Sequence, residues 1–146
     1  MKPDRRSASV AQQAFTIDTP GRGLIEITDS IRRFVRNSGM TVGVAHVFVS
    51  HTSCSLLVTE NADPDVRADL ERYFSRLVPD GDSLYAHDVE GPDDMPAHVR
   101  AALTAVSLSL PLSNGGLALG TWQGVYLWEH RQRPHRRHVT ITLVGG

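Results

Sequence analysis

The sequence predicts a single-domain protein of the α+β class. Its 146 residues suffice for one domain with a substantial hydrophobic core. Some segments carry apolar residues at helical spacing, and others alternate or are rich in β-branched residues. Several neighbouring strands are expected toward the C-terminus, and strands and helices that come in runs favour an α+β fold over a parallel α/β sheet.

The N-terminal part is expected to hold one strand before the first helix. Residues 1–10 are polar and lack periodicity, so we predict a flexible tail there and one domain over residues 11–146. Ala14–Asp18 alternates weakly, which indicates a strand. Pro20–Gly23 predicts a turn after that strand, because proline and glycine favour turns.

The first helix is predicted after this turn. Thr28 or Asp29 can accept a hydrogen bond from a free backbone N–H at its start, and Gly39 suits its end. Between these positions the apolar side chains recur at helical spacing, at Ile31, Phe34 and Val35.

Two strands and a second helix follow. Val42–Ser50 is rich in β-branched residues, and Ser55–Thr59 resembles it after a short break. Asp63 can cap the next helix, and Pro64 fits the first helical position, where its missing N–H costs nothing. One face of this helix carries its apolar residues, Val66, Leu70, Tyr73, Phe74 and Leu77.

A third helix and a series of short strands complete the predicted domain. Asp93 or Asp94 can cap the helix, which has Pro96 in its first turn. Its buried side is expected at Val99, Leu103 and Val106. Asn114–Gly116 predicts a hairpin turn. The strands are expected at Ser107–Leu112, Leu117–Thr121, Val125–Glu129 and His138–Val144.

The composition argues against several classes of protein. Apolar residues make up 40% and charged residues 21%, as in ordinary globular proteins. Fifteen Lys and Arg residues balance 16 Asp and Glu residues, so nothing calls for nucleic acid or an anionic membrane as partner. The chain shows no signal peptide and no membrane-spanning run. Its single cysteine, Cys54, permits no disulfide within the chain, which suits the cytoplasm.

The first segment with candidate chemistry is Ser50–Asp69. His51 follows a predicted strand, at a position where scaffolds often present functional groups. Asn61 and Asp63 bring further polar groups to the start of a helix, although capping alone also explains Asp63. Cys54 between two serines is expected to be a small buried residue rather than a nucleophile.

The second segment is His87–His98, which is rich in imidazoles and carboxylates. Neutral histidine binds metals or transfers protons, and nearby carboxylates such as Glu90 can complete a metal site. Asp94 and His98 are four residues apart and share one face if Asp94 lies in the first helical turn. The alternative is an acidic, solvated loop followed by a surface histidine.

The third segment is Gly120–His130. Trp122 offers a flat face for a ring, while Gln123 and Glu129 offer an amide and a carboxylate. A tightly packed hairpin with tryptophans in the core is an equal alternative. A basic stretch follows and either binds phosphate or forms a solvated turn; it contains Arg131, Arg133, Arg136 and Arg137.

Together these motifs resemble the YjbQ-like family over nearly the whole chain, from about Phe15 to Gly146. They are His51–Ser55, Glu60–Val66, His87–Gly91, Asp93–His98 and Leu119–Gly124, in this order. The family is associated with a secondary thiamine phosphate synthase activity. In many relatives asparagine stands at the position of Asp94, and an anion there makes a nearby cation more plausible. The stretch after Glu129 departs from the family's usual pattern, so the resemblance assigns it no function.

The resemblance implies a β-sandwich-like α+β fold of antiparallel sheets with about three helices. It also implies a homotrimer with sites near its subunit boundaries. The family's recurrent polar positions match residues of all three segments. From these positions and from the chemistry of the segments we expect metal ligands at His51, His87 and His98, catalytic groups at Asp63, Glu90, Asp94, Gln123 and Glu129, and substrate contacts at Asn61 and Trp122.

Three functions remain open from the sequence. The first is a transferase that joins a thiazole phosphate to a pyrimidine diphosphate, assisted by a divalent metal, zinc or magnesium. The second is a protein that binds a metal or a small ligand without catalysis. The third is a metal-dependent phosphoester hydrolase. The first and third imply a small phosphorylated substrate.

Overall fold

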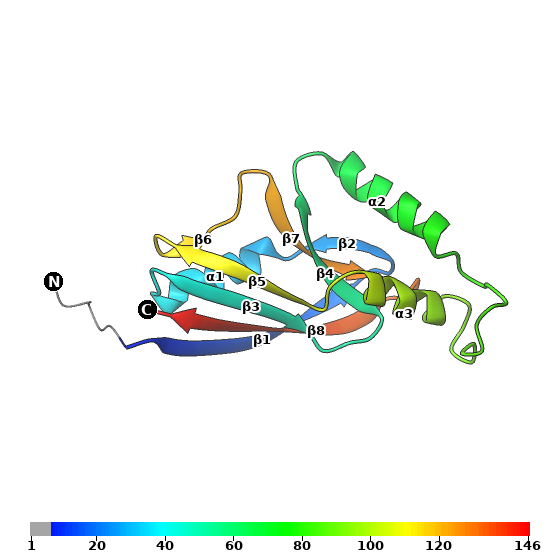
Figure 1. Ribbon diagram of the computed structural model, residues 1–146, viewed down its shortest axis with the longest axis horizontal. Coiled ribbons are helices and arrows are strands. Elements are labelled where there is room, and N and C mark those ends of the chain that lie inside the picture. The colour runs from blue at the N-terminus through cyan, green and yellow to red at the C-terminus, as the bar shows by residue number, and fades with distance from the viewer. Residues whose placement is uncertain (1–6) are drawn as a thin grey trace.

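The computed structural model describes residues 7–146, and it confirms the α+β class (Figure 1). The larger sheet has five strands in the order β1-β8-β3-β5-β6. All its neighbouring strands run antiparallel. Its strands are β1 (Ser9–Thr19), β3 (Gly43–Val49), β5 (Ser107–Ser113), β6 (Gly116–Leu117) and β8 (His135–Gly145).

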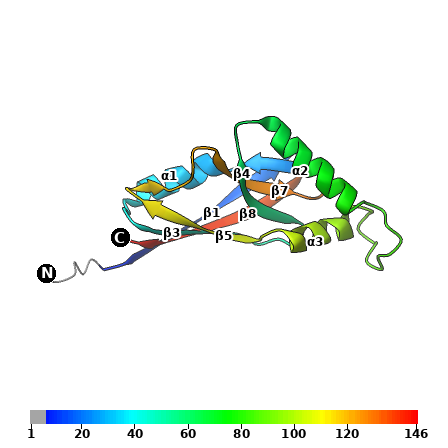
Figure 2. The same ribbon diagram turned by 45° about the horizontal axis from the view of Figure 1, so that its top comes forward.

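A smaller sheet has three antiparallel strands in the order β2-β7-β4. They are β2 (Gly23–Glu26), β4 (Cys54–Glu60) and β7 (Gln123–Glu129). Figure 2 shows the small sheet and α1 (Thr28–Ser38) on the same side of the large sheet. One apolar core joins them, with Ile31 and Val35 from α1, Val47 and Ile141 from the large sheet and Leu127 from the small one.

The observed strands differ from the predicted ones near the N-terminus, whereas the predicted hairpin turn is present. β1 pairs with β8 from Ser9 onward, so residues 9 and 10 belong to the sheet, while residues 1–6 of the predicted tail lie outside the described residues. The short strand β2 (Gly23–Glu26) was not predicted from the sequence. The predicted hairpin turn is confirmed, since Asn114 and Gly115 both have positive φ, at 53° and 79°, as a two-residue type I′ turn requires.

The strand predicted at Leu117–Thr121 is wrong beyond Leu117. The Gly120 N–H donates to Gln123 Oε1 at 2.8 Å, and the chain turns there before β7 begins. The Ala118 N–H still donates to the Pro111 carbonyl of β5 at 2.9 Å, whereas the Leu119 N–H donates locally to the Leu117 carbonyl at 3.1 Å.

Helix α1 ends as predicted but begins differently. Gly39 closes it with a φ of 71°, a left-handed conformation that glycine adopts without strain. Neither Thr28 nor Asp29 caps its start, where Ile27 holds the capping position without a side-chain hydrogen bond. Thr28 Oγ1 instead accepts a hydrogen bond from the Val125 N–H at 2.9 Å and thereby ties α1 to β7.

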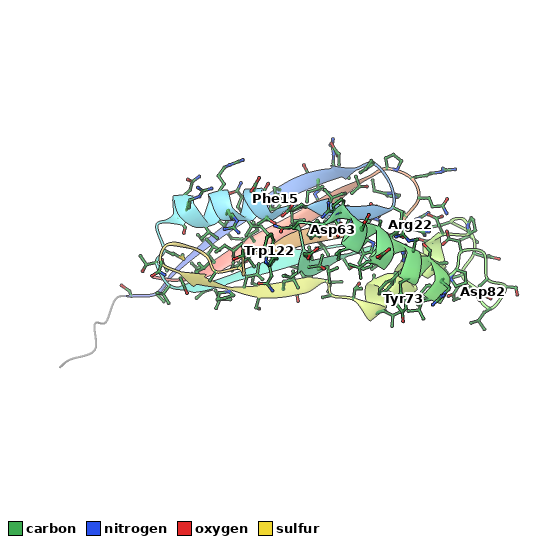
Figure 3. The ribbon with its side chains drawn as sticks, turned by 90° about the horizontal axis from the view of Figure 1, so that it is seen from above. Phe15, Arg22, Asp63, Tyr73, Asp82 and Trp122 are labelled. Atoms are coloured by element: carbon green, nitrogen blue, oxygen red, sulfur yellow. The ribbon has the colours of Figure 1, made fainter. Side chains whose placement is uncertain are left out.

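Helix α2 (Pro64–Leu77) begins as predicted and lies on the surface. Asp63 accepts a hydrogen bond from the Asp65 N–H at 2.9 Å, with Pro64 in the first turn. The helix runs from Asp63 toward Asp82 (Figure 3), and none of its residues is buried. The predicted apolar face is therefore only partly covered, with Tyr73 55% and Leu77 53% exposed.

Glu71 connects α2 to the body of the protein. Its carboxylate accepts hydrogen bonds from Trp128 Nε1 at 2.8 Å and from Arg100 Nη2 at 2.5 Å. The guanidinium of Arg100 also lies 5.6 Å from the ring centroid of Trp128. This polar contact anchors the helix together with Phe74 of the predicted apolar face, whose ring centroid lies 4.7 Å from that of Trp128.

Helix α3 (Asp94–Leu103) buries a face other than the predicted one. Leu103 is 57% exposed, and Val106 beyond the helix is 39% exposed. The buried residues are Asp94, Pro96, Ala97, Arg100 and Ala101. Small alanine side chains let the helix approach the sheet closely, and the Glu71 carboxylate compensates the charge of Arg100, so this face is buried despite its polar members.

No helix among the described residues is both long and apolar enough to cross a membrane.

Candidate metal centre

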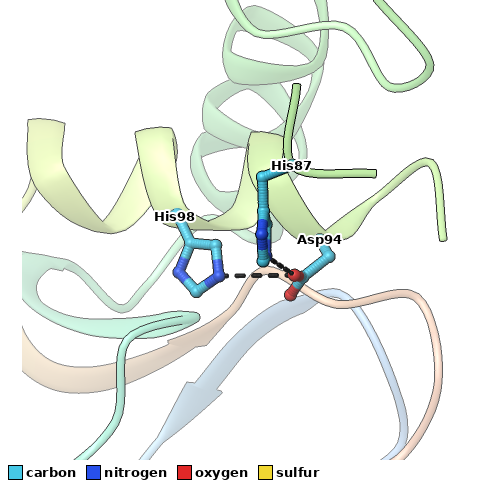
Figure 4. Close-up of side chains that lie close together, drawn as sticks. All are labelled: His87, Asp94 and His98. Carbon is cyan, nitrogen blue, oxygen red and sulfur yellow. Dashed lines mark hydrogen bonds and ion pairs between the residues drawn. The ribbon is translucent and has the colours of Figure 1, made fainter. Parts of the chain in front are cut away.

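His87, Asp94 and His98 converge at the start of α3 (Figure 4). His87 Nε2 lies 2.8 Å from Asp94 Oδ2, and His98 Nε2 lies 3.4 Å from the same oxygen. Each residue offers a ligand atom, and these atoms all lie within 4.8 Å of one another. Three donors at such distances can close around one cation by small side-chain rotations.

Local backbone geometry produces this convergence. Asp94 and His98 lie one turn apart on α3, so their side chains share a face. His87 comes from the preceding loop, which turns at Gly91, where φ is 105°. Few residues other than glycine adopt this φ, and the turn lets the loop fold back so that His87 faces the helix.

Asp94 is held as a buried carboxylate. Its side chain is only 2% exposed. Burial alone would raise its pKa, but the hydrogen bond from His87 and the charges of His98 and Arg131 outweigh burial and lower the pKa below its ordinary value. Asp94 is therefore ionised near neutral pH and can serve as an anionic ligand.

The hydrogen bond to Thr52 fixes the position of the proton on the ring of His98. His98 Nδ1 lies 2.9 Å from the Thr52 carbonyl oxygen, which can only accept, so Nδ1 carries the proton. Nε2, on the other side of the ring, faces Asp94 Oδ2 at 3.4 Å and is the nitrogen that would bind a metal. Metal-binding histidines commonly donate their second N–H in this way.

Two imidazoles and one carboxylate suit zinc or another first-row transition metal. Magnesium prefers oxygen ligands and waters, so this donor set fits zinc better than the magnesium also considered from the sequence. Three protein ligands leave a fourth position of a tetrahedral site for water or substrate. His87 is about half exposed and opens onto a cavity of about 470 Å³, which Tyr85 and Met95 also line.

His51, the third expected metal ligand, lies outside this group. Its Nε2 accepts a hydrogen bond from the His138 backbone N–H at 2.8 Å, and the rings of His51 and His138 stack with centroids 5.5 Å apart. Burial, followed by the charges of Arg137 and His138, lowers the pKa of His51. The lone pair that a metal would need is thus already used.

Glu129 is part of a fully buried ion pair. Its Oε1 accepts hydrogen bonds from Thr19 Oγ1 at 2.7 Å and Arg137 Nε at 2.8 Å, and its Oε2 accepts from Arg137 Nη2 and from the Arg131 N–H. Four donors occupy the positions that a carboxylate offers. In this arrangement Glu129 anchors Arg137, and Arg137 in turn donates to Ser53 in the loop behind His51.

The expected residues at the start of α2 and β7 form a separate group. The Asn61 N–H donates to the Trp122 carbonyl at 2.9 Å, which joins the segment of Asn61 and Asp63 to that of Trp122 and Gln123. In the β4–β7 pair, Cys54 faces Glu129 at one end and Glu60 faces Gln123 at the other. Seven strand residues separate these ends by about 20 Å. One chain therefore does not bring this group to the metal centre.

The loop that precedes α3 and the basic stretch after β7 meet beside the centre. Arg131 binds the carboxylates of Asp93 and Asp94, and its Nη2 donates to the Glu90 carbonyl at 3.0 Å. The Glu90 side chain is exposed and stands outside the three-residue group. Arg131 was expected either to bind phosphate or to lie in a solvated turn, and neither the spacing nor the composition of the sequence indicated this contact.

The other arginines of the basic stretch serve different contacts. Arg136 pairs with Asp18 on the surface, and Arg137 is buried with Glu129. Arg133 is exposed. The four arginines thus do not form one phosphate-binding cluster within the described residues.

Comparisons with known proteins agree with this architecture. The family described as UPF0047 protein YjbQ-like matches residues 13–146. The UPF0047 protein sll1880 of Synechocystis is 52% identical over 92% of this chain and 91% of its own length. The UPF0047 protein YjbQ of Salmonella typhimurium is 45% identical over 92% of this chain and 97% of its own length.

Solved structures share the fold. A YbjQ-like protein of unknown function from Sulfolobus solfataricus superposes with a TM-score of 0.88, at 23% identity, over 96% of this chain and all of the other. A conserved hypothetical protein from Thermus thermophilus has a TM-score of 0.76 at 35% identity, over 88% of this chain and 97% of its own. The chain therefore belongs to the YjbQ-like UPF0047 family.

Proposed function

We propose that this protein is a metal-dependent enzyme that acts on a small phosphorylated molecule at His87, Asp94 and His98. The convergence of these three ligand atoms within 4.8 Å is the observation that carries the proposal. The buried, ionised carboxylate, the fixed tautomer of His98 and the adjoining cavity support it. A metal bound there would neutralise negative charge on a phosphate or diphosphate group.

The reaction we propose first is the one that the family resemblance implies. The ring nitrogen of a thiazole phosphate attacks the methylene carbon of a pyrimidine diphosphate. A C–N bond forms, the C–O bond to the diphosphate breaks, and thiamine phosphate and diphosphate result. In this scheme Asp94 and the two histidines hold the cation, and the cavity beside His87 receives the substrate.

We further propose a homotrimer in which neighbouring subunits complete each site. The group of Asn61, Asp63, Trp122 and Gln123 lies at the end of the β4–β7 pair opposite Cys54 and Glu129, about 20 Å away along the strands. A second subunit can bring its own copy of this group closer to the metal centre. Leu84 and Val89 support an interface here, because they are 80% and 86% exposed on the loop that carries His87. The single cysteine supports a cytoplasmic location.

Complementation between inactive variants tests this arrangement. We expect coexpressed His98→Ala and Trp122→Ala chains to regain activity, because some mixed trimers contain one site with both native groups. A mass of three times 16.0 kDa is expected in solution. Equal inactivity of the mixture and of each variant alone, or a monomeric mass, would contradict shared sites.

The proposed activity is tested with protein purified without chelators. We expect zinc-loaded protein to form thiamine phosphate from the two substrates, and His98→Ala to lose this activity. His46→Ala is the matched control, because His46 is exposed on the outer face of β3, away from the centre. No product with loaded wild-type protein, or equal activity of the His98 variant, would refute the synthase.

Hydrolysis of a phosphoester is the second candidate. Three protein ligands with one open position are the arrangement in which zinc lowers the pKa of bound water to about 7. Release of inorganic phosphate from a phosphomonoester, without any acceptor and with dependence on His87 and His98, would favour hydrolysis. Stoichiometric zinc with neither reaction would favour a binding protein.

A further inference from the structure

Arg131 contacts both sides of the candidate metal centre. Its side chain is 14% exposed, and each of its three nitrogens donates to a different group. Nε lies 3.0 Å from Asp93 Oδ2, Nη1 lies 2.9 Å from Asp94 Oδ1, and Nη2 lies 3.0 Å from the Glu90 carbonyl. One guanidinium thus joins two consecutive carboxylates at the start of α3, those of Asp93 and Asp94, to the loop that carries His87.

The contact divides the two oxygens of Asp94. Arg131 occupies Oδ1, while His87 and His98 both face Oδ2. A cation is therefore expected at Oδ2, because the positive guanidinium beside Oδ1 would repel a cation there. The planar guanidinium suits this task, because its donors have fixed directions.

Backbone hydrogen bonds of the same turn hold Arg131 in place beside the site. The Gln132 N–H donates to Asp93 Oδ2 at 2.8 Å, and the Arg131 N–H donates to Glu129 Oε2 at 3.2 Å. The turn after β7 is therefore bound to the start of α3 and to the buried Glu129. Arg131 also balances one of two adjacent negative charges, so that Asp93 and Asp94 can lie side by side.

We propose that Arg131 is a positioning residue that keeps Asp94 a one-oxygen ligand and sets the metal affinity of the centre. This inference rests on the proposed function, because it requires that His87, Asp94 and His98 bind a metal. Arg131 itself touches no metal ligand atom other than the far oxygen of Asp94. Its effect is expected on affinity and coordination, beyond any effect on folding.

Zinc affinity of the Arg131→Gln variant tests the inference. In competition with a chromogenic chelator, we expect zinc to bind about 10–100-fold more weakly than to wild type, as for other residues that orient metal ligands. Arg133→Gln is the control, since Arg133 is an exposed arginine of the same turn, and it should bind zinc like wild type. Equal affinity of Arg131→Gln and wild type would overturn the inference.

Cobalt spectra give a readout that a merely structural residue would not change. Freed from Arg131, Asp94 can bind with both oxygens, so we expect a higher coordination number and weaker visible absorption per bound Co²⁺ in Arg131→Gln. An unchanged spectrum would contradict the positioning function.

A lysine variant separates charge from geometry and serves if Arg131→Gln does not fold. Arg131→Lys keeps the positive charge but cannot span both carboxylates and the carbonyl with fixed donors, so we expect weakened zinc binding. Wild-type affinity in Arg131→Lys would show that charge alone suffices and would overturn the inference. If wild-type protein binds no zinc, the proposed function fails, and with it the function of Arg131. If wild-type protein binds zinc and the Arg131 variants bind it with equal affinity, the inference alone fails.

Discussion

Arg137 and Glu129 form a buried ion pair beneath the loop of His51. Arg137 Nη2 and Glu129 Oε2 lie 2.5 Å apart, and the two side chains are 5% and 0% exposed. The pair connects β7 to β8, the strands that run through the small and the large sheet respectively. Its partners Thr19 and Ser53 extend the connection to β1 and to the loop before β4.

Glu129→Gln is expected to destabilise the protein strongly. The substitution leaves the Arg137 charge buried without its counter-ion, which typically costs about 3–5 kcal/mol. Urea denaturation should show the loss as a lower midpoint. Asp18→Asn, in the exposed pair with Arg136, is the control and should leave the midpoint unchanged. Similar midpoints for Glu129→Gln and wild type would contradict the structural importance of this pair.

We expect the buried His130 to make the folded protein less stable in acid. Burial, followed by the charges of Arg100, Arg22 and Arg137, lowers its pKa to about 2, so it stays neutral in the folded state. Below an ordinary pKa of about 6.5 the unfolded chain takes up a proton that the folded state does not. The free energy of unfolding should therefore fall as pH drops below about 6.5, by up to about 1.4 kcal/mol per pH unit.

The His130→Gln variant checks the origin of this slope. Glutamine keeps a polar group near Ser55, whose hydroxyl lies 2.8 Å from His130 Nε2, but it does not titrate. Denaturation between pH 4 and pH 7 should give a flatter dependence for the variant. Parallel pH dependences would show that other groups govern acid unfolding.

Cys54 should be chemically inert in the native protein. Burial raises the pKa of its thiol to about 12, so almost no thiolate exists near neutral pH. A thiol reagent such as dithionitrobenzoate should react with it only after denaturation. Rapid reaction under native conditions would instead indicate that Cys54 is a nucleophile, contrary to the expectation from the sequence.

Glu71 should control the local stability of α2. This helix has no buried residue, and Glu71 binds both Trp128 and Arg100. In Glu71→Gln we expect faster hydrogen exchange in residues 64–77, because the helix loses a charged anchor and Arg100 loses its counter-ion. The matched control is Asp69→Asn, which removes an exposed contact with Arg72 on the same helix. Equal exchange in both variants would contradict the anchoring by Glu71.

The parts of the fold that could be predicted are those determined by residues close together in the sequence. Asp63 and Pro64 start α2, Gly39 ends α1, and Asn114 with Gly115 forms the hairpin turn, each by chemistry within a few residues. The buried face of α3 was not predictable from apolar spacing. Arg100 lies on that face because Glu71, 29 residues away in sequence, supplies its counter-ion. Such pairings depend on tertiary contacts that periodicity does not record.

In the candidate site, too, the residues close in sequence were predictable, whereas the contacts between distant segments were not. Asp94 and His98 share a helix, so their spacing already indicated a common face, and His87 lay within the same segment. The sequence also joined His51 and Trp122 to this site, but the strand register separates Trp122 from it, and the lone pair of His51 is used by His138. Arg131 was missed because its partners, Asp93 and Asp94, lie almost 40 residues earlier in the chain.

The stoichiometry of zinc binding tests the central claim most directly. After exhaustive dialysis against a zinc buffer, we expect wild-type protein and His46→Ala to retain one zinc ion per chain. His87→Ala and His98→Ala should each bind zinc more than about 100-fold more weakly, since each removes a ligand of a three-residue centre. Wild-type protein that retains no more zinc than His98→Ala would contradict the metal centre and the function built on it.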